Sequence, residues 1–389
     1  MLIAEDKIDN PVLAVPSSHA AREEVMSAPV PPPPHSTDRW DAWDSFLEAT
    51  SETGFMQSSW WADFRVNYGY EHFGIVLKGR NGIVGGALVQ KYSDTSDCCF
   101  YYVPEGPVLS GDESIAGEIF EAILEAIEQR RKTEDQTVSH LRIEPRWQRL
   151  PGFVRGFRST PESMDKYREP RNTLCIDLRP SEAAILARMK PKGRYNIRVA
   201  QRHGVTVLED TSDQGLADFL RIYKRTAARQ RIGAKPSGYF RTLISMLSSL
   251  KNGSVFFAEY GGKRIAAAVV VYFGRRATYF FGGSLATYRR VMAPYLLHFE
   301  IMRRARAMGL EWYDLWGVAP EDEPDHRWRD LSVFKRKFGG VEVKLVPTLD
   351  YVYDSAAYDR CVAGQRASGD TGFRDPLSPE CIPNPEACE

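Results

Sequence analysis

The feature that most constrains the fold is an internal repeat of secondary-structure patterns. Each copy reads as two helices, a β-hairpin, a further strand, a long helix and a closing strand, in that order. In the first copy the hairpin strands flank Asn81-Gly82, a pair that favours a tight turn. The long helix carries an isoleucine at every fourth position from Ile115 to Ile127. The pattern predicts two α+β layers, each with a mixed, mostly antiparallel sheet that receives one crossover helix.

The second copy repeats this order of elements after residue 180. Its hairpin turns at Gly261-Gly262, and Gly282-Gly283-Ser284 follows its third strand. Its long helix is predicted to begin near Pro294, because proline is favoured in the first turn of a helix. Pro191 is expected to delay one of the opening helices until Arg194. The succession is typical of the acyl-CoA N-acyltransferase (GNAT) fold, here in two tandem copies.

The repeat sets the expected domain boundaries. We expect a first GNAT-like domain at residues 38–155 and a second at residues 156–345, with segment 346–363 packing back on the first domain. Residues 1–37 and 364–389 are rich in proline and small polar residues, which predicts a disordered leader and a disordered tail.

Composition excludes several functional classes. The 389 residues include 51 basic and 51 acidic side chains, so the chain lacks the bulk positive charge of a histone-like protein. No apolar run is long enough to span a bilayer, and the first residues do not resemble a secretory signal. The six cysteines form no CxxC pair, so we expect free thiols, a cytoplasmic location and no metal site.

Several sequence blocks of the second copy carry a family resemblance. They are Lys192-Gly-Arg194-Tyr195-Asn196-Ile197-Arg198, then Thr226-Ala-Ala-Arg229, then Tyr279-Phe-Phe-Gly282-Gly283-Ser284, and finally Phe334-Lys335-Arg336-Lys337-Phe338-Gly339-Gly340. The first copy adds the looser matches Gln57-Ser-Ser-Trp-Trp61, Arg65 and Tyr102-Val-Pro104-Glu105-Gly106-Pro107. These blocks resemble the Fem family, in the compact form of FemX without the helical hairpin of FemA and FemB.

The resemblance implies an activity. Fem proteins are aminoacyltransferases that move an amino acid from aminoacyl-tRNA to the stem-peptide amine of a peptidoglycan precursor, which is UDP-MurNAc-pentapeptide or lipid II. It also implies that no cofactor is needed, that the chain acts as a monomer, and that it can touch the inner membrane face peripherally. Two positions depart from the family pattern, since Glu105 replaces a basic residue and Ser110 an acidic one.

Unevenly distributed basic residues suggest phosphate binding. Arg194 and Arg198 lie four apart with Arg202, so they share one helix face, and guanidinium groups can grip phosphates bidentately. The first and last of the resembling blocks contain five basic residues that we predict to contact tRNA or phosphate: Lys192, Arg194, Arg198, Arg336 and Lys337. The alternative interpretation is a solvated helix face.

The resemblance also assigns residues to the reaction. Lys335 is the expected cation near the reacting ester, with Phe334 packed beside it, and substrate binding is expected from Arg65, Tyr102, Arg229, Tyr279 and Ser284. Ester aminolysis needs a neutral amine and a stabilised oxyanion. For these residues the alternatives are surface charges and packed strand aromatics. Asp314 is expected to hold either a substrate amine or a structural hydrogen bond.

Two rival functions remain open at this point. A CoA-dependent N-acyltransferase would carry a glycine-rich turn for the pyrophosphate, but Tyr288-Arg-Arg-Val-Met-Ala-Pro294 contains no glycine. A non-catalytic relative that binds RNA or the cell-wall precursor is favoured by the departures at Glu105 and Ser110.

Overall fold

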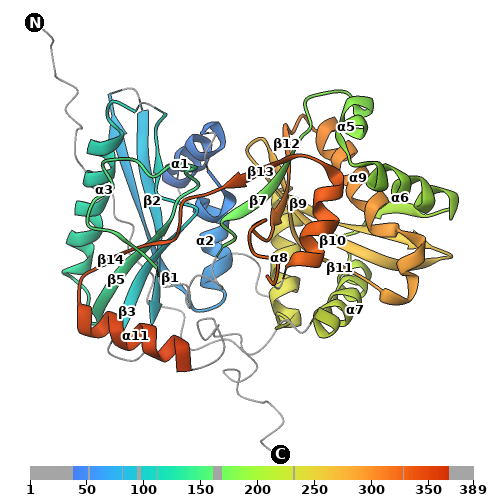
Figure 1. Cartoon of the computed structure of the whole chain (residues 1–389). Coiled ribbons are helices and arrows are strands. Elements are labelled where there is room, and N and C mark those ends of the chain that lie inside the picture. Colours follow the sequence, from blue (N-terminus) through green and yellow to red (C-terminus); the bar gives the residue numbers. More distant parts are fainter. Residues whose placement is uncertain are drawn as a thin grey trace, which may run out of the picture. The chain divides into compact units, whose positions relative to one another are not determined.

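The computed structural model describes residues 38–50, 53–80, 82–93, 98–111, 113–160, 169–230, 233–326 and 328–367. The described chain divides into two compact units (Figure 1). Unit 1 contains the described residues up to Glu169 and those from Leu345 onward, and unit 2 runs from Pro170 to Lys344. The predicted leader, residues 1–37, lies outside the described residues. The predicted tail does so from residue 368, whereas its first four residues belong to a helix that ends at Ala367.

Unit 1 is an α+β layer built on one mixed sheet. Its elements are α1 (Asp38–Ala49), η1 (Phe55–Gln57), α2 (Ser59–Val66), β1 (Glu71–Gly79), β2 (Gly82–Ser93), β3 (Cys98–Pro104), β4 (Val108–Leu109), α3 (Ala116–Arg131), β5 (Thr137–Glu144), β6 (Arg158–Ser159), β14 (Leu349–Val352) and α11 (Ser355–Ala367). The strand order is β1-β2-β3-β5-β14-β6, with β4 beside β2. Only β3 and β5, which α3 connects, pair in parallel among these strands.

Unit 2 repeats this plan on a second mixed sheet. Its elements are β7 (Asn172–Asp177), α5 (Glu182–Arg188), α6 (Pro191–Arg202), β8 (Thr206–Glu209), α7 (Asp213–Gln230), α8 (Ser237–Leu250), β9 (Gly253–Tyr260), β10 (Lys263–Phe273), β11 (Arg276–Ser284), η2 (Ala286–Val291), α9 (Ala293–Ala307), β12 (Trp312–Gly317), α10 (Arg329–Lys335), η3 (Arg336–Phe338) and β13 (Val341–Lys344). The order is β13-β7-β12-β11-β10-β9-β8, and only β11 and β12 pair in parallel.

The two predicted copies of the repeat are confirmed by these sheets. In unit 1, α3 connects β3 to its parallel neighbour β5. In unit 2, α9 connects β11 to its parallel neighbour β12 in the same way. The isoleucine row of α3 faces the core, since Ile119, Ile123 and Ile127 are buried. The delay expected at Pro191 is wrong, because α6 begins at this proline, where a missing N–H costs nothing. The repeat pattern also missed α8.

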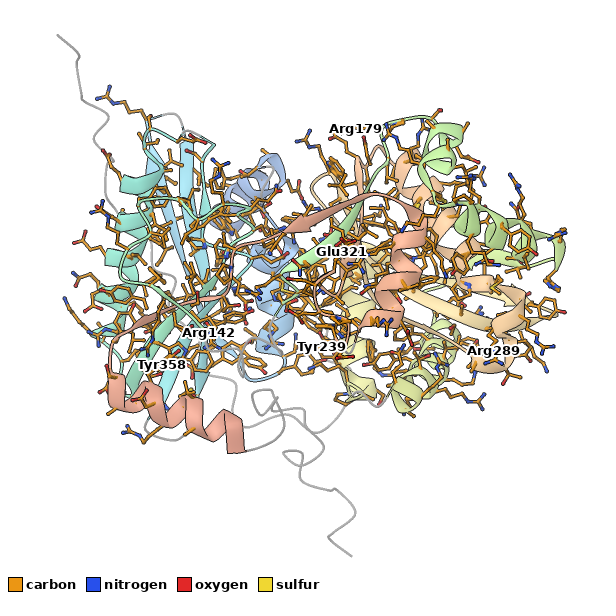
Figure 2. All side chains as sticks on the ribbon, in the orientation of Figure 1. Arg142, Arg179, Tyr239, Arg289, Glu321 and Tyr358 are labelled. Carbon is orange, nitrogen blue, oxygen red and sulfur yellow. The ribbon has the colours of Figure 1, made fainter. Side chains whose placement is uncertain are left out.

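A buried ion pair ties the returning end of the chain to unit 1. β14 lies between β5 and β6, and Asp350 accepts two hydrogen bonds from Arg142, at 2.7 and 2.8 Å. Both side chains are fully buried, and the hydroxyl of Tyr358 donates to the same carboxylate at 2.7 Å (Figure 2). These hydrogen bonds hold the pKa of Asp350 below its usual range against the opposing effect of burial.

Asp350→Ala is expected to lower the free energy of unfolding by about 3–5 kcal/mol, because it leaves the Arg142 guanidinium buried without its carboxylate. Urea unfolding measures this change. Asp359→Ala removes an exposed carboxylate from α11 and serves as the control, with little expected change. Equal stability of the two variants would contradict this role for the ion pair.

None of the described helices combines the length and the apolar composition needed to cross a lipid bilayer.

Candidate functional site

The parallel strands of unit 2 separate part-way along their length. β11 and β12 pair at three positions, the last being Thr278 with Asp314, although the strands continue to Ser284 and Gly317. In unit 1 the equivalent strands, β3 and β5, pair from Cys98 to Pro104, with one register shift between Cys99 and Tyr101. In the second copy the two strands therefore part beyond Thr278 and Asp314, and Lys335, a predicted catalytic residue, reaches the end of β12 from α10.

Asp314 shapes the end of β12. Its Oδ1 accepts hydrogen bonds from the hydroxyl of Thr173 on β7 and from the backbone N–H of Trp316, the latter at 2.8 Å. Trp316 has a φ of 63°, and the register between β12 and β7 shifts between Asp314 and Gly317. The fully buried Asp314 thus supports a β-bulge, which re-aims the following backbone. Of the two expected roles for Asp314, the structure supports a structural hydrogen bond rather than a contact with a substrate amine.

Lys335 is buried at the end of α10 and reaches this bulge. Its Nζ donates a hydrogen bond to the carbonyl oxygen of Gly317 at 2.6 Å, and only 3% of the residue is exposed. Burial lowers the pKa of the Lys335 ammonium to about 7, and the negative charge of Asp314 opposes this shift. An amine with a pKa near neutrality can be present as a cation and still exchange a proton during a reaction.

Aromatic rings surround the lysine. The Nζ of Lys335 lies 5.8 Å from the ring centre of Tyr279, which packs edge-on against the His298 ring at 4.6 Å. Phe334 packs against His298 at 5.6 Å and against Phe338 at 5.3 Å. Burial raises the pKa of Tyr279 to about 12, so its hydroxyl is neutral at physiological pH. The structure thus brings the predicted residues Lys335, Phe334 and Tyr279 together.

His298 is a member of this cluster that the sequence did not single out. Its Nδ1 shares a hydrogen bond with the hydroxyl of Tyr313 at 2.7 Å. Burial and the charge of Lys335 lower the pKa of His298 to about 3, so it is neutral and a poor proton acceptor near pH 7. The only signal in the sequence was a histidine within the apolar face of the long second-copy helix.

Ser284 and Arg229 form a second group in unit 2. The Thr226 hydroxyl and the Arg229 guanidinium both donate to the Ser284 carbonyl oxygen, at 3.2 and 2.8 Å. A side chain at Gly282 would collide with Tyr279, and one at Gly283 with Thr226. The glycines of this block therefore permit close packing within the protein itself.

The predicted phosphate-binding residues differ in what they contact. The Arg336 guanidinium pairs with the Glu342 carboxylate and donates to the carbonyl of Ala319 at 2.7 Å. Arg194 donates to the carbonyls of Ala187 and Met189, at the end of α5. These two arginines make contacts within the protein, and their predicted contact with tRNA or phosphate stays a prediction.

The remaining members of that set keep their charges accessible. Lys192 and Arg198 are exposed on α6, and Lys192 lies over the ring of Tyr195 with its Nζ 4.6 Å from the ring centre. Lys337 is half-buried and donates to the hydroxyl of Tyr295 at 3.2 Å.

Unit 1 holds the other predicted binding residues in polar networks. Arg65 of α2 donates to the hydroxyl of Tyr92 at 3.0 Å and lies over the ring of Tyr70 at 3.7 Å. The Tyr102 hydroxyl donates to Glu144, which also accepts from Thr348 at 2.9 Å.

Glu105, a departure from the family pattern, is also part of the unit 1 interior. Its carboxylate accepts from Arg146 at 2.7 Å and from the backbone N–H of Met56 at 3.0 Å. The acidic residue at this position is therefore paired with Arg146 inside unit 1.

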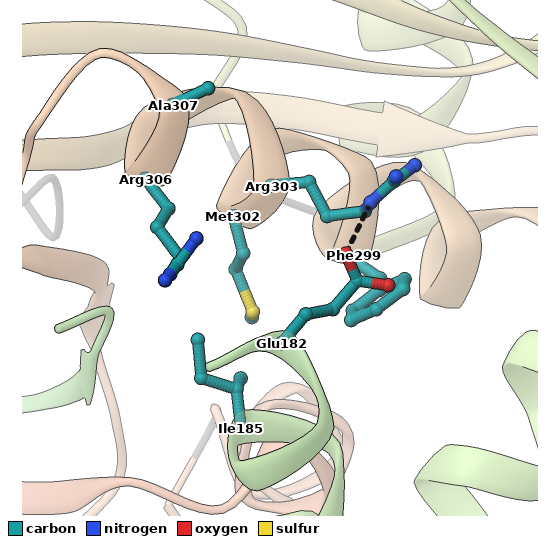
Figure 3. Close-up of a pocket in the computed structure, with 7 residues that line it drawn as sticks. All are labelled: Glu182, Ile185, Phe299, Met302, Arg303, Arg306 and Ala307. Carbon is teal, nitrogen blue, oxygen red and sulfur yellow. Dashed lines mark hydrogen bonds and ion pairs between the residues drawn. The ribbon is translucent and has the colours of Figure 1, made fainter. Parts of the chain in front are cut away.

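A surface pocket of about 220 Å³ lies apart from these groups, between α5 and α9 (Figure 3). Ile185 and Met302 line it, and Arg303 pairs with Glu182 at 2.8 Å on one side. Its lining includes none of the predicted site residues. Within the described residues, no group of three or more His, Cys, Asp and Glu side chains could hold a metal ion.

Comparison with known proteins places these features in a family. The FemAB family model matches residues 148–256 and 245–361, which together span more than half of the chain. The chain belongs to the FemAB family. The FemAB match includes α6, the strand β11, the strand β12 and the segment that carries Lys335.

Similar proteins cover most of the chain. A UDP-N-acetylmuramoylpentapeptide-lysine N(6)-alanyltransferase of Weissella viridescens is 24% identical over 339 residues, which are 85% of this chain and 97% of the relative. A lipid II:glycine glycyltransferase of Staphylococcus saprophyticus is 21% identical, over 82% of this chain and 92% of the relative. The crystal structure of FemX shares the fold, with a TM-score of 0.75 at 16% identity over 84% of this chain and 98% of that one.

The Lys335 ammonium is expected to titrate near pH 7, and Asp314→Asn is expected to move its midpoint lower, because the neutral amide no longer stabilises the cation. Nitrogen NMR of labelled lysine side chains measures both midpoints, and Lys335→Arg assigns the resonance. A midpoint near the ordinary lysine value of about 10.4 in the native protein would contradict the burial argument.

Proposed function

We propose that this FemAB protein is an aminoacyltransferase that moves an amino acid from aminoacyl-tRNA to the stem-peptide amine of a peptidoglycan precursor, UDP-MurNAc-pentapeptide or lipid II. The observation that carries the proposal is the buried Lys335 at the separation of β11 and β12, in a chain whose relatives are named for alanyl and glycyl transfer to such precursors. Since the donor is charged tRNA, the reaction takes place in the cytoplasm.

The reaction joins an ester and an amine without redox chemistry. The neutral acceptor amine attacks the ester carbonyl carbon, and the carbonyl oxygen becomes an oxyanion. The C–N bond then remains, the C–O bond to the ribose breaks, and the ribose hydroxyl leaves with a proton. A cation close to the developing oxyanion lowers this barrier, and a water-poor site makes the effect larger.

In this proposal, the ammonium of Lys335 stabilises either the oxyanion or the departing ribose oxygen. One of its three N–H groups is directed to Gly317, so the bulge fixes the position of Nζ while other donors stay available. Phe334 packs in the aromatic group around the lysine and keeps water away from it.

The acceptor amine loses its proton to substrate groups or to water in this proposal. His298 has a pKa of about 3 and its Nδ1 is engaged with Tyr313, which makes it a weak base. Tyr279 is a neutral hydroxyl and acts as a binding group.

For the acceptor precursor, we propose binding by four of the residues that the family resemblance singles out: Arg65, Tyr102, Arg229 and Ser284. Arg65 carries a guanidinium suited to the diphosphate. The Tyr102 hydroxyl, fixed by Glu144, can orient a polar group of the precursor.

The segment before α9 supports RNA-dependent transfer over a CoA-dependent reaction. CoA-dependent enzymes of this fold hold a pyrophosphate on the backbone of a glycine-rich turn. Here residues 286–291 form the 3₁₀ helix η2, and Met292 adopts a left-handed φ of 59° before α9 begins.

Incubation with a pool of charged tRNAs and UDP-MurNAc-pentapeptide is expected to add the mass of one amino acid to the precursor, detected by mass spectrometry. Acetyl-CoA in place of charged tRNA is expected to add nothing. Lys335→Met should slow the transfer by about 10²–10³-fold, the effect of losing one oxyanion donor. Acetyl transfer, or no transfer to either precursor, would contradict the proposed function.

A further inference from the structure

Unit 2 carries exposed cations that lack an acidic partner in the described part of the chain. Several of its arginines are paired, as Arg264 is with Asp210 and Arg304 is with Glu209. Seven basic residues on α6, on the β9–β10 turn and on η2 are exposed and form no ion pair with any described residue: Lys190, Lys192, Arg198, Arg202, Lys263, Arg289 and Arg290. Unpaired positive charge concentrated in this way produces a field that attracts anions.

Ring contacts show that these three segments meet. His203, which follows α6, lies 6.2 Å ring to ring from Tyr260 at the end of β9. Tyr260 in turn lies 6.2 Å from the ring of Tyr288 in η2. We use the name α6–η2 surface for these three rings and the seven cations; Figure 2 labels one of them, Arg289.

The surface begins beside the segment that holds the reactive lysine. The backbone N–H of Lys190 donates to the Lys337 carbonyl at 3.1 Å, and Gly193 packs against the same carbonyl so closely that a side chain would not fit. From this point the twelve residues of α6 extend about 18 Å to His203. A ligand whose end lies at Lys335 could thus follow α6 toward η2.

The composition of the surface fits RNA. Arginines grip phosphate oxygens bidentately, and tyrosine and histidine rings offer faces for base or ribose contacts. A membrane-binding surface would need apolar side chains to insert, and the exposed large hydrophobic residue of α6 is Tyr195, whose ring carries a polar hydroxyl. The apolar side of α6 is already buried, with Ile197 and Ala200 inside unit 2.

We propose that the α6–η2 surface binds the phosphate backbone of the RNA donor, beyond the terminal nucleotide that carries the ester. This inference rests on the proposed function, because it names where the body of the donor is held. It adds Arg202, Lys263, Arg289 and Arg290 to the residues that contact RNA. A full-length donor would then bind more tightly than a short one, because only the full-length RNA reaches this surface.

Paired variants test the surface by charge removal. Arg289→Gln with Arg290→Gln, and Arg198→Gln with Arg202→Gln, each remove two positive charges from it. Lys251→Gln with Lys344→Gln removes two exposed charges that also form no ion pair with a described residue, one before β9 and one at the end of β13, and is the matched control. Binding of bulk deacylated tRNA is measured over a range of salt concentrations, with thermal unfolding as the check on folding.

Each surface pair is expected to raise the Kd for tRNA about tenfold at low salt and to flatten the plot of log K against log salt by about 1.4–1.8. The control pair should match the native protein. A Kd and a slope like those of the native protein in both surface pairs would overturn the proposal. Binding to phosphatidylglycerol vesicles is measured alongside, and surface pairs that lose vesicle binding but keep tRNA binding would also overturn it.

A comparison of donors separates this inference from the proposed function. The ratio of transfer from full-length charged tRNA to transfer from an aminoacylated terminal dinucleotide should fall about tenfold in both surface pairs. An unchanged ratio with active transfer would overturn the surface alone. Absence of transfer from both donors in the native protein, with tRNA binding that still depends on the surface pairs, would overturn the function and leave the surface standing.

Discussion

The hydrogen bond from a buried lysine to a backbone carbonyl is the contact on which the site depends. An ammonium loses several kcal/mol of hydration when it is buried, so it needs compensation from the protein. Gly317 supplies an acceptor and Asp314 supplies negative charge, and the β-bulge at Trp316 joins the two. The compensation is partial, since the lysine pKa still falls to about 7. A lysine so placed is suited to proton transfer and oxyanion stabilisation at neutral pH.

The two copies of the fold differ where this contact forms. In unit 1 the parallel pair β3 and β5 stays joined to Pro104, and the adjoining Glu105 is bound by Arg146. In unit 2 the equivalent strands separate after Thr278, and Lys335 occupies the region beyond. The same topology therefore yields one sheet whose parallel pair stays joined and one whose parallel pair separates part-way. We place the chemistry in the second copy for this reason.

The repeat was predicted well from the sequence because it depends on local patterns. Hairpin turns and the isoleucine row of α3 follow from short-range rules, whereas Lys335, Phe334 and Tyr279 were selected by the family resemblance, and their roles in the reaction stay a prediction. Long-range partners were not readable in the same way. Arg194 and Arg336 were predicted to contact tRNA or phosphate, and the sequence did not show that carbonyls and Glu342 accept hydrogen bonds from them. His298 was missed because only the fold brings it to Tyr279.

The most direct test of the account is the pH dependence of single-turnover transfer by the native protein and by Lys335→Arg. The acceptor amine, whose ordinary pKa is about 10, must be neutral and Lys335 must be a cation, so the native rate should rise with pH up to about 7 and then level off, because the loss of the lysine cation offsets the gain in neutral amine. In the arginine variant, whose guanidinium stays charged, the rise should continue past neutrality even if the rate is lower. The same levelling near pH 7 in both proteins would contradict the role assigned to this lysine.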